Sequence, residues 1–179
     1  MIARYSSRAT RLDKQFLNDK LHNAQSYDRI AGYFSSSVLE ITGEAIESIS
    51  GKVRLICNSQ IEKEDCETAT AAAAALRLEW CENKPEKVYA VATPRLKRLY
   101  EFIKSNKLEI KILPNNVFGL IHGKAGVITL SDGSKTSFIG SVNETLSAWR
   151  LNYEWWDGSP LFESLRLVES AIFPLRKGG

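Results

Sequence analysis

Hydrophobic and polar positions alternate with two different periods along the chain. Apolar side chains spaced three and four residues apart predict amphipathic helices, which fall at residues 10–23, 35–49, 65–83, 93–106 and 160–173. Short runs rich in β-branched and aromatic residues predict strands, which fall at residues 27–34, 52–57, 108–113, 120–130, 135–140 and 153–156. Strands that alternate with helices favour an α/β fold, with a mixed β-sheet flanked by helices on both faces.

Local signals mark the boundaries of several elements. Ser35 or Ser36 can provide the N-cap of the second helix. Thr93 places a capping hydroxyl before Pro94, which suits the first position of the fourth helix. Residues 131–134, Ser-Asp-Gly-Ser, separate two predicted strands and therefore indicate a β-hairpin.

Length and composition fit one globular domain. The chain has 179 residues, 44% hydrophobic and 25% charged, which is enough to bury a core without disulfides or a structural metal. We therefore expect a single domain over residues 1–179, either alone or as the N-terminal domain of a larger protein. The 24 basic and 21 acidic side chains leave a net charge of +3, which permits an anionic partner without requiring one.

No segment has the pattern of a signal peptide or of a membrane-spanning helix, which needs roughly 18 apolar residues. Cys57, Cys66 and Cys81 form no CxxC pair and are expected to be buried or half-buried apolar side chains. These features favour a cytoplasmic protein without membrane contact. Two histidines and three cysteines also disfavour a dedicated metal site, so no metal and no cofactor are expected.

The residues with the clearest chemical character lie in the last third of the chain. His122 and Lys124 are two residues apart in a predicted strand, so both side chains point to one face. Ser141 and Asn143 have the same spacing at the end of the next strand, and Glu154 follows in a short apolar strand. An imidazole can attack phosphorus, a carboxylate can orient it, and the other three side chains can bind phosphate oxygens. The set points to phosphoryl chemistry.

This set resembles the HKD motif of the phospholipase D superfamily: His-x-Lys at 122–124, Gly-Ser-x-Asn at 140–143, and Glu154 eleven residues beyond the asparagine. The stretches YDRIAGYFSSSVLE at 27–40 and KVRLICNSQ at 52–60 are similar to the beginning of phospholipase D-like nuclease domains. Such domains occur in restriction endonucleases and beside helicases in bacterial defence proteins. The resemblance spans nearly the whole chain and implies a phospholipase D-like fold with one HKD motif per chain.

The resemblance also implies a role for each residue of the motif. His122 would attack the phosphodiester and form a phosphohistidine, and Glu154 would orient the imidazole. Lys124, Asn143 and Ser141 would hold the phosphate. A second histidine would protonate the leaving group and then activate water.

The family builds each active site from two HKD motifs, and this chain has one. His22 is followed two residues later by Ala24 instead of lysine, so it does not form a second motif. A homodimer with both copies of His122 at the two-fold axis is the simplest way to complete a site.

One position departs from the family pattern. The pattern places an aspartate five residues after the lysine, where this chain has Thr129, and Asp132 lies eight residues after Lys124 at the expected hairpin tip. Because that aspartate is regarded as structural more than chemical, we expect an active site in preference to a decayed one.

Two further features have a structural and a functional interpretation. The helix over residues 93–106 is basic, and a solvated face is favoured over a phosphate-binding groove. Trp149, Trp155 and Trp156 are candidates for stacking on bases, but packing in the core or at a dimer interface is favoured for at least two of them.

The sequence thus predicts a homodimeric, metal-independent phosphodiesterase of the phospholipase D-like nuclease type, acting on nucleic acid and on DNA in preference to RNA. A helicase or recognition domain or subunit is the expected source of sequence specificity. Two alternatives stay open. One is a phosphodiesterase that acts on phospholipids, and the other is a non-catalytic nucleic-acid-binding or dimerisation module of a restriction or helicase defence protein.

Overall fold

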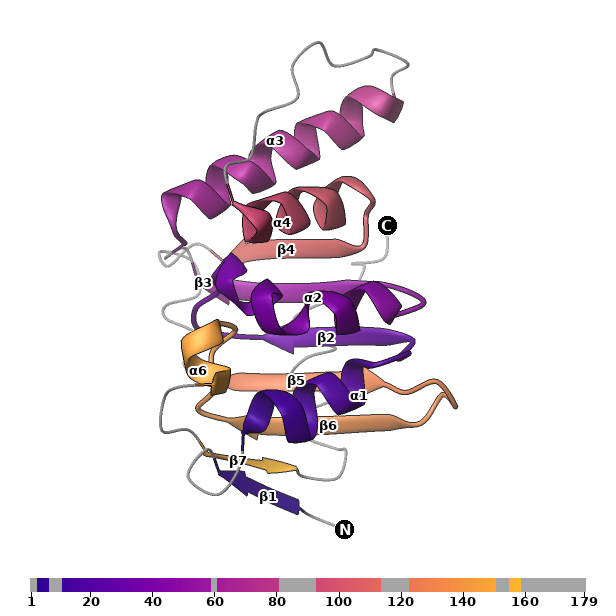
Figure 1. The fold of residues 1–179 in the computed structure, drawn as a ribbon, viewed down its shortest axis with the longest axis vertical. Coiled ribbons are helices and arrows are strands. Elements are labelled where there is room, and N and C mark those ends of the chain that lie inside the picture. Colours follow the sequence, from indigo (N-terminus) through magenta and orange to yellow (C-terminus); the bar gives the residue numbers. More distant parts are fainter. Residues whose placement is uncertain are drawn as a thin grey trace, which may run out of the picture.

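In a computed structural model of the protein, the strands of the described chain form one seven-stranded sheet (Figure 1). The structure describes residues 3–6, 11–58, 61–80, 93–113, 123–150 and 155–158, and within these the side chains of 3–5, 76–80 and 155–158 are not described. The strands are β1 Ala3–Ser6, β2 Ser26–Ile30, β3 Val53–Asn58, β4 Leu108–Leu113, β5 Lys124–Thr129, β6 Lys135–Gly140 and β7 Trp155–Gly158. Their spatial order is β1-β7-β6-β5-β2-β3-β4.

Helices in the described chain cover one face of this sheet (Figure 1). Their bounds are η1 Asp13–Asn18, which has wide π-type turns, α1 Asp19–Leu21, η2 Ser36–Val38, α2 Leu39–Ser48, α3 Lys63–Trp80, α4 Pro94–Lys104 and α6 Leu146–Arg150. The long helix α3 packs against α4 next to the edge strand β4. The helix predicted over residues 160–173 lies outside the described residues.

The sheet has a parallel half and an antiparallel half that meet at β2. β2, β3 and β4 run parallel, whereas β5, β6 and β7 continue in antiparallel pairs from the other side of β2. Parallel neighbours need crossover connections, which α2 supplies between β2 and β3, and α3 with α4 between β3 and β4. The predicted mixed α/β sheet is confirmed, but the described helices lie on one face of it, whereas helices on both faces were predicted.

Several predicted boundaries agree with the structure to within a few residues, and others differ. The strand predicted over residues 27–34 ends at Ile30, because the chain leaves the sheet there to pair with the segment after β6. Ser35 caps the following turn, with its Oγ accepting a hydrogen bond from the Ser37 N–H at 3.3 Å. Thr93 occupies the N-cap position of α4, but its buried hydroxyl has no hydrogen-bond partner among the described residues, which corrects the predicted cap. The sequence patterns missed the short elements β1 and α6.

Four aromatic rings join the sheet to the helical layer. Phe138 on β6 meets Phe16 edge-on, with ring centroids 5.2 Å apart, and Trp149 at 6.0 Å. Tyr27 on β2 stacks on the same ring at 6.5 Å. All four side chains are buried. Ring pairs of this kind stabilise a fold by about 0.5–1.5 kcal/mol beyond the burial of their area.

Gly126 on β5 leaves the space that the Phe138 ring occupies. A Cβ atom at position 126 would lie 2.4 Å from the ring Cζ, and the ring cannot retreat because Phe16 and Trp149 enclose it. Gly126→Ala is therefore expected to lower the free energy of unfolding by about 1–3 kcal/mol, measured by urea denaturation. Gly123→Ala is the matched control, since its Cβ would have no atom of the described chain within 4 Å. Equal stability of Gly126→Ala and the parent would contradict this packing.

The cysteines within the described chain differ in environment. Cys57 on β3 is buried, and burial raises the pKa of its thiol to about 11, so the thiol stays neutral near pH 7. Cys66 on α3 is exposed, which corrects the expectation that it is buried or half-buried. Cys81 lies outside the described residues.

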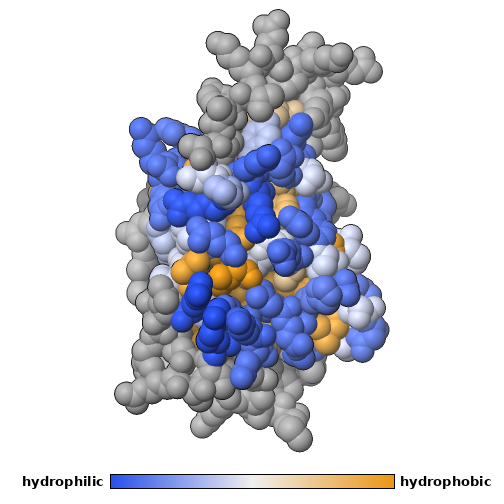
Figure 2. Space-filling view, in the orientation of Figure 1, coloured by the Kyte–Doolittle hydropathy of each residue, from blue (hydrophilic) through white to orange (hydrophobic). Residues whose placement is uncertain are grey.

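Hydrophilic side chains dominate the described part of the helical face, with a small apolar patch near its middle (Figure 2). None of the helices in the described ranges is both long enough and apolar enough to cross a bilayer.

Candidate active site

Three of the five predicted site residues lie within the described chain, and the sheet brings them to one end. Lys124 is the first residue of β5 and pairs with Gly140, the last residue of β6. Ser141 and Asn143 follow directly after that strand. The antiparallel register therefore places Lys124 beside the start of the Ser-x-Asn segment, at the end of the sheet where β2 also ends.

His122 and Glu154 lie outside the described residues, but their neighbours in sequence frame the same end of the sheet. His122 comes two residues before the start of β5. Glu154 comes directly before β7, in which Trp156 pairs with Gly140. The roles of both side chains stay predictions.

The segment after β6 keeps the alternation of a strand. Val142 is buried in the core, with 2% of its surface exposed, whereas Ser141 and Asn143 on either side are partly exposed. This alternation is what the two-residue spacing predicted. The two polar side chains therefore project away from the core on the same side of the segment.

The amide of Asn143 is oriented by the backbone after β2. Its Oδ1 accepts a hydrogen bond from the Tyr33 N–H at 3.1 Å. The Glu144 N–H donates to the Tyr33 carbonyl at 3.1 Å, and the Ser35 N–H donates to the Glu144 carbonyl at 3.1 Å. Because the acceptor atom of the Asn143 amide is used in this way, its NH₂ group is left to donate to a ligand. A donor of this kind suits a phosphate oxygen.

Directly after Asn143, the side chain of Glu144 enters the core and pairs with Arg29 on β2. The Arg29 Nε lies 2.9 Å from Glu144 Oε2, and the two side chains are only 1% and 7% exposed. Arg29 also donates from Nη2 to the carbonyl of Val142. One guanidinium therefore binds the residue on each side of Asn143.

Aromatic side chains complete the surroundings of this ion pair. The Tyr27 hydroxyl donates to Glu144 at 3.3 Å, and the Trp149 Nε1–H donates to it at 3.4 Å. Burial, followed by the nearby Glu144 charge, raises the pKa of Tyr27 well above its ordinary value, so the phenol keeps its proton. The Arg29 guanidinium lies 4.9 Å from the centroid of the Phe138 ring. The Glu144 carboxylate thus accepts hydrogen bonds from three different side chains.

Thr129, the departure from the HKD pattern, lies far from this end of the sheet. It is the last residue of β5, five residues or roughly 17 Å from Lys124 along the strand. An odd spacing also places the two side chains on opposite faces. The Thr129 hydroxyl accepts a hydrogen bond from the Ser26 Oγ at 3.1 Å. Asp132 belongs to the hairpin turn, where its Oδ1 accepts from the Ser134 N–H at 2.8 Å.

The basic residues around α4 are largely bound within the chain. Arg95 lies 3.6 Å from a carboxylate oxygen of Glu62. Arg98 donates to the Leu39 carbonyl at 3.2 Å, and the Lys107 ammonium donates to a backbone carbonyl at the end of α2. Because these contacts occupy the cations, they argue against a phosphate-binding groove along this helix.

Trp149 is fully buried and packs in the core, as the structural interpretation of the tryptophans favoured. It is therefore not a platform for stacking on bases. The side chains of Trp155 and Trp156 are among those that the structure does not describe.

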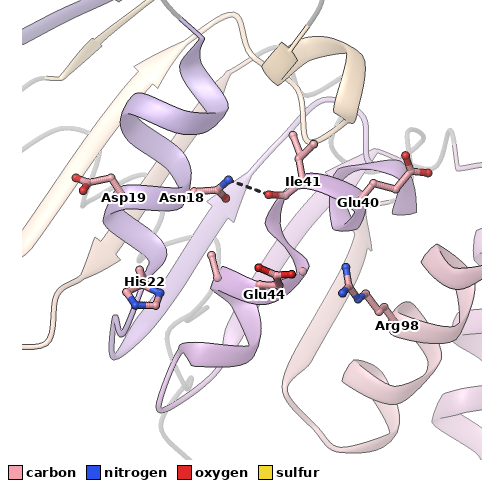
Figure 3. Close-up of a pocket in the computed structure, with 9 residues that line it drawn as sticks. Asn18, Asp19, His22, Glu40, Ile41, Glu44 and Arg98 are labelled. Atoms are coloured by element: carbon pink, nitrogen blue, oxygen red, sulfur yellow. Dashed lines mark hydrogen bonds between the residues drawn. The ribbon is translucent and has the colours of Figure 1, made fainter.

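A pocket of about 540 Å³ lies elsewhere, between α1, α2 and α4 (Figure 3). It is lined by Asn18, Asp19, His22, Glu40, Ile41, Gly43, Glu44, Ala45 and Arg98. None of the described site residues contributes to it, and its three carboxylates outnumber its one guanidinium, which disfavours an anionic ligand. His22 is exposed here. Within the described ranges, no three His, Cys, Asp or Glu side chains are grouped to hold a metal ion.

The sequence patterns did not predict a role for Arg29, Glu144 and Tyr33 at this site. A signal was present for Arg29, because it shares a strand face with the apolar Tyr27 and Ala31, and a charge on a core face requires a partner. Glu144 adjoins the motif without belonging to it. Tyr33 acts through its backbone N–H, which no residue pattern reveals.

A family model described as cardiolipin synthase, phospholipase D-like domain, matches residues 17–156. Because this match covers most of the chain, the protein belongs to the phospholipase D-like family, within a superfamily of phosphodiesterases. No curated protein sequence matches the chain.

The fold is similar to that of yeast tyrosyl-DNA phosphodiesterase, with a TM-score of 0.51 and 12% sequence identity over 89% of this chain. The match covers 32% of the yeast chain, so this chain spans about a third of that enzyme's length. Nuc, a phospholipase D family member from Salmonella typhimurium, aligns with a TM-score of 0.47 and 14% identity, covering 96% of this chain and 89% of the Nuc chain. Family membership and the yeast likeness confirm the predicted phospholipase D-like fold.

Proposed function

We propose that the protein is a metal-independent nuclease that hydrolyses nucleic acid, DNA in preference to RNA, through a phosphohistidine. The observation that carries this proposal is the convergence of Lys124, Ser141 and the donor side of Asn143 at one end of the sheet. His122 and Glu154 adjoin this end in sequence. Family membership supplies the phosphodiesterase chemistry, and the similar yeast enzyme acts, by its name, on tyrosyl-DNA.

The reaction proceeds in two displacements at phosphorus. In the first, the imidazole of His122 forms a P–N bond while the P–O bond to the leaving group breaks, and a second histidine protonates the departing oxygen. In the second, that histidine removes a proton from water, the water oxygen bonds to phosphorus and the P–N bond breaks. Glu154 holds the other imidazole nitrogen, and Lys124, with the two polar side chains after β6, stabilises charge on the non-bridging oxygens.

The second histidine comes from a second copy of the chain. His22 lines the pocket between α1, α2 and α4, to which none of Lys124, Ser141 and Asn143 contributes, so it does not complete the site. A homodimer that brings two copies of His122 together at its axis supplies both histidines. Selection of a particular DNA sequence is left to a separate recognition or helicase domain or subunit.

Cleavage assays in EDTA test this function. The protein is incubated with single-stranded DNA, duplex DNA, RNA and phospholipid vesicles, each with excess EDTA or with Mg²⁺. We expect DNA cleavage at the same rate in both conditions, because a histidine nucleophile with lysine and amide donors requires no metal. Cleavage that needs Mg²⁺ would contradict the mechanism. Hydrolysis of the vesicles alone, or DNA binding without cleavage, would replace this function by one of the two alternatives.

A further inference from the structure

Arg29 and Glu144 form a buried ion pair around Asn143 that belongs to no recognised motif. We propose that these two side chains are positioning residues, which hold the Asn143 amide in the orientation that binds phosphate. The inference rests on the proposed function, because it assumes that the amide NH₂ of Asn143 binds the reacting phosphate.

The contacts of Arg29 restrict the backbone on both sides of Asn143. Its Nη2 binds the carbonyl of Val142, and its Nε binds the side chain of Glu144 at 2.9 Å. The preceding and following residues are therefore tied to one rigid group on β2, a strand in the centre of the sheet. The Tyr33 N–H then sets the rotation of the amide by donating to Asn143 Oδ1.

Stability alone does not account well for this pair. A buried ion pair can often be replaced by apolar side chains without loss of stability, because burial removes the hydration of both charges. Here Arg29 Nη1 is buried and has no hydrogen-bond partner in the described chain, and two aromatic rings border the guanidinium. The polar contacts of the pair converge instead on the segment that carries Asn143. We therefore assign the pair to placing that segment accurately.

A second ion pair on the same strand provides a control. Asp28 and Arg54 are joined by two hydrogen bonds of 2.6 Å, and their side chains are 14% and 23% exposed. Asp28 directly precedes Arg29 in β2, so the two side chains point to opposite faces of the sheet. The Asp28–Arg54 pair therefore lies on the face away from the Arg29–Glu144 pair.

The test replaces the buried pair by apolar side chains in the full chain. Arg29→Met combined with Glu144→Leu removes both charges together and leaves neither unpaired, so the variant is expected to fold. We expect kcat to fall by about 10- to 100-fold while KM changes little, because a displaced donor loses transition-state contacts more than binding. Circular dichroism and urea denaturation confirm that the variant is folded at the assay temperature.

A second readout does not depend on activity. Hydrogen exchange of the Tyr33 amide, followed by NMR, reports whether Asn143 Oδ1 still accepts its hydrogen bond. We expect exchange in the double variant to be at least about tenfold faster than in the parent. The Ala31 amide, which donates to the Ile56 carbonyl, is the internal reference and should be unchanged.

Control variants separate positioning from general destabilisation. Asp28→Asn combined with Arg54→Gln should keep the parent kcat and the parent exchange rate at Tyr33. Arg29→Lys keeps a positive charge beside Glu144 but lacks the fork of donors that reaches both Val142 and Glu144, so it should show a smaller loss of kcat, and it decides the question if the double variant fails to fold. A folded variant of the buried pair with the parent kcat would overturn the proposal. If the parent cleaves no phosphodiester, the proposed function fails, and exchange at Tyr33 alone decides whether the pair positions Asn143.

Discussion

Replacement of His122 by alanine is expected to lower kcat for DNA cleavage by about 10⁴-fold or more, because the variant lacks both the nucleophile and the general acid. The measurement is single-turnover and steady-state cleavage in EDTA, using the substrate that the parent cleaves. The chain offers a matched control in its other histidine, since His22 is exposed and lines a different pocket. His22→Ala should keep the parent activity. Cleavage that survives His122→Ala would remove the phosphohistidine from the mechanism.

Mixtures of the two proteins test whether the site is shared between copies. A mixed dimer of parent and His122→Ala contains one histidine where two are needed, so it should be inactive. After co-refolding at equal amounts, only the dimers of two parent chains are active, and total activity should be about one quarter of that of the parent protein at the same total chain concentration. Activity of about one half would show that each chain works independently.

Replacement of Asn143 by aspartate is expected to lower kcat/KM by about 10²- to 10³-fold, at least as much as replacement by alanine. An aspartate keeps an oxygen that can accept the Tyr33 N–H, so the local backbone pairing is retained. It exchanges the NH₂ donor for a negatively charged oxygen, which repels phosphate. The comparison therefore isolates the donor role of the amide from its role in the fold.

Two measurements complete this prediction. Urea denaturation should show that Asn143→Asp is at least as stable as Asn143→Ala. Cleavage kinetics should then show the aspartate variant as the less active of the two. An aspartate variant with near-parent activity would mean that Asn143 serves only to join the segment after β6 to the backbone at Tyr33.

Thr129 illustrates how tertiary position changes the interpretation of a motif. In the sequence, an aspartate is missing from the HKD pattern, which leaves a decayed site open as an alternative. In the structure, Thr129 lies at the other end of β5 from Lys124 and binds Ser26. The alternation of side chains along a strand already predicts, from sequence alone, that Thr129 and Lys124 point to opposite faces of the sheet. The hydrogen bond between Thr129 and Ser26, however, can be recognised only once β2 is known to lie beside β5.

Features that depend on neighbours in the sequence could be predicted without the structure. Residues 108–113 and 135–140 were predicted as strands with the bounds of β4 and β6, because apolar alternation and flanking turn residues are local signals. The hairpin between β5 and β6 follows from its turn, and a hairpin fixes its own register. Lys124 therefore had to lie close to the Ser-x-Asn segment.

Contacts that depend on the order of strands in the sheet could not be predicted without the fold. Arg29 and Glu144 are 115 positions apart, and they meet because β2 inserts between β3 and β5. The basic side chains around α4 likewise meet partners that are distant in sequence, in this case because helices pack against one another. Local periodicity reports which face of an element is buried, but it does not report which element covers that face. The residue types of the candidate site were thus readable from the sequence, whereas the residues that hold Asn143 in place required the fold.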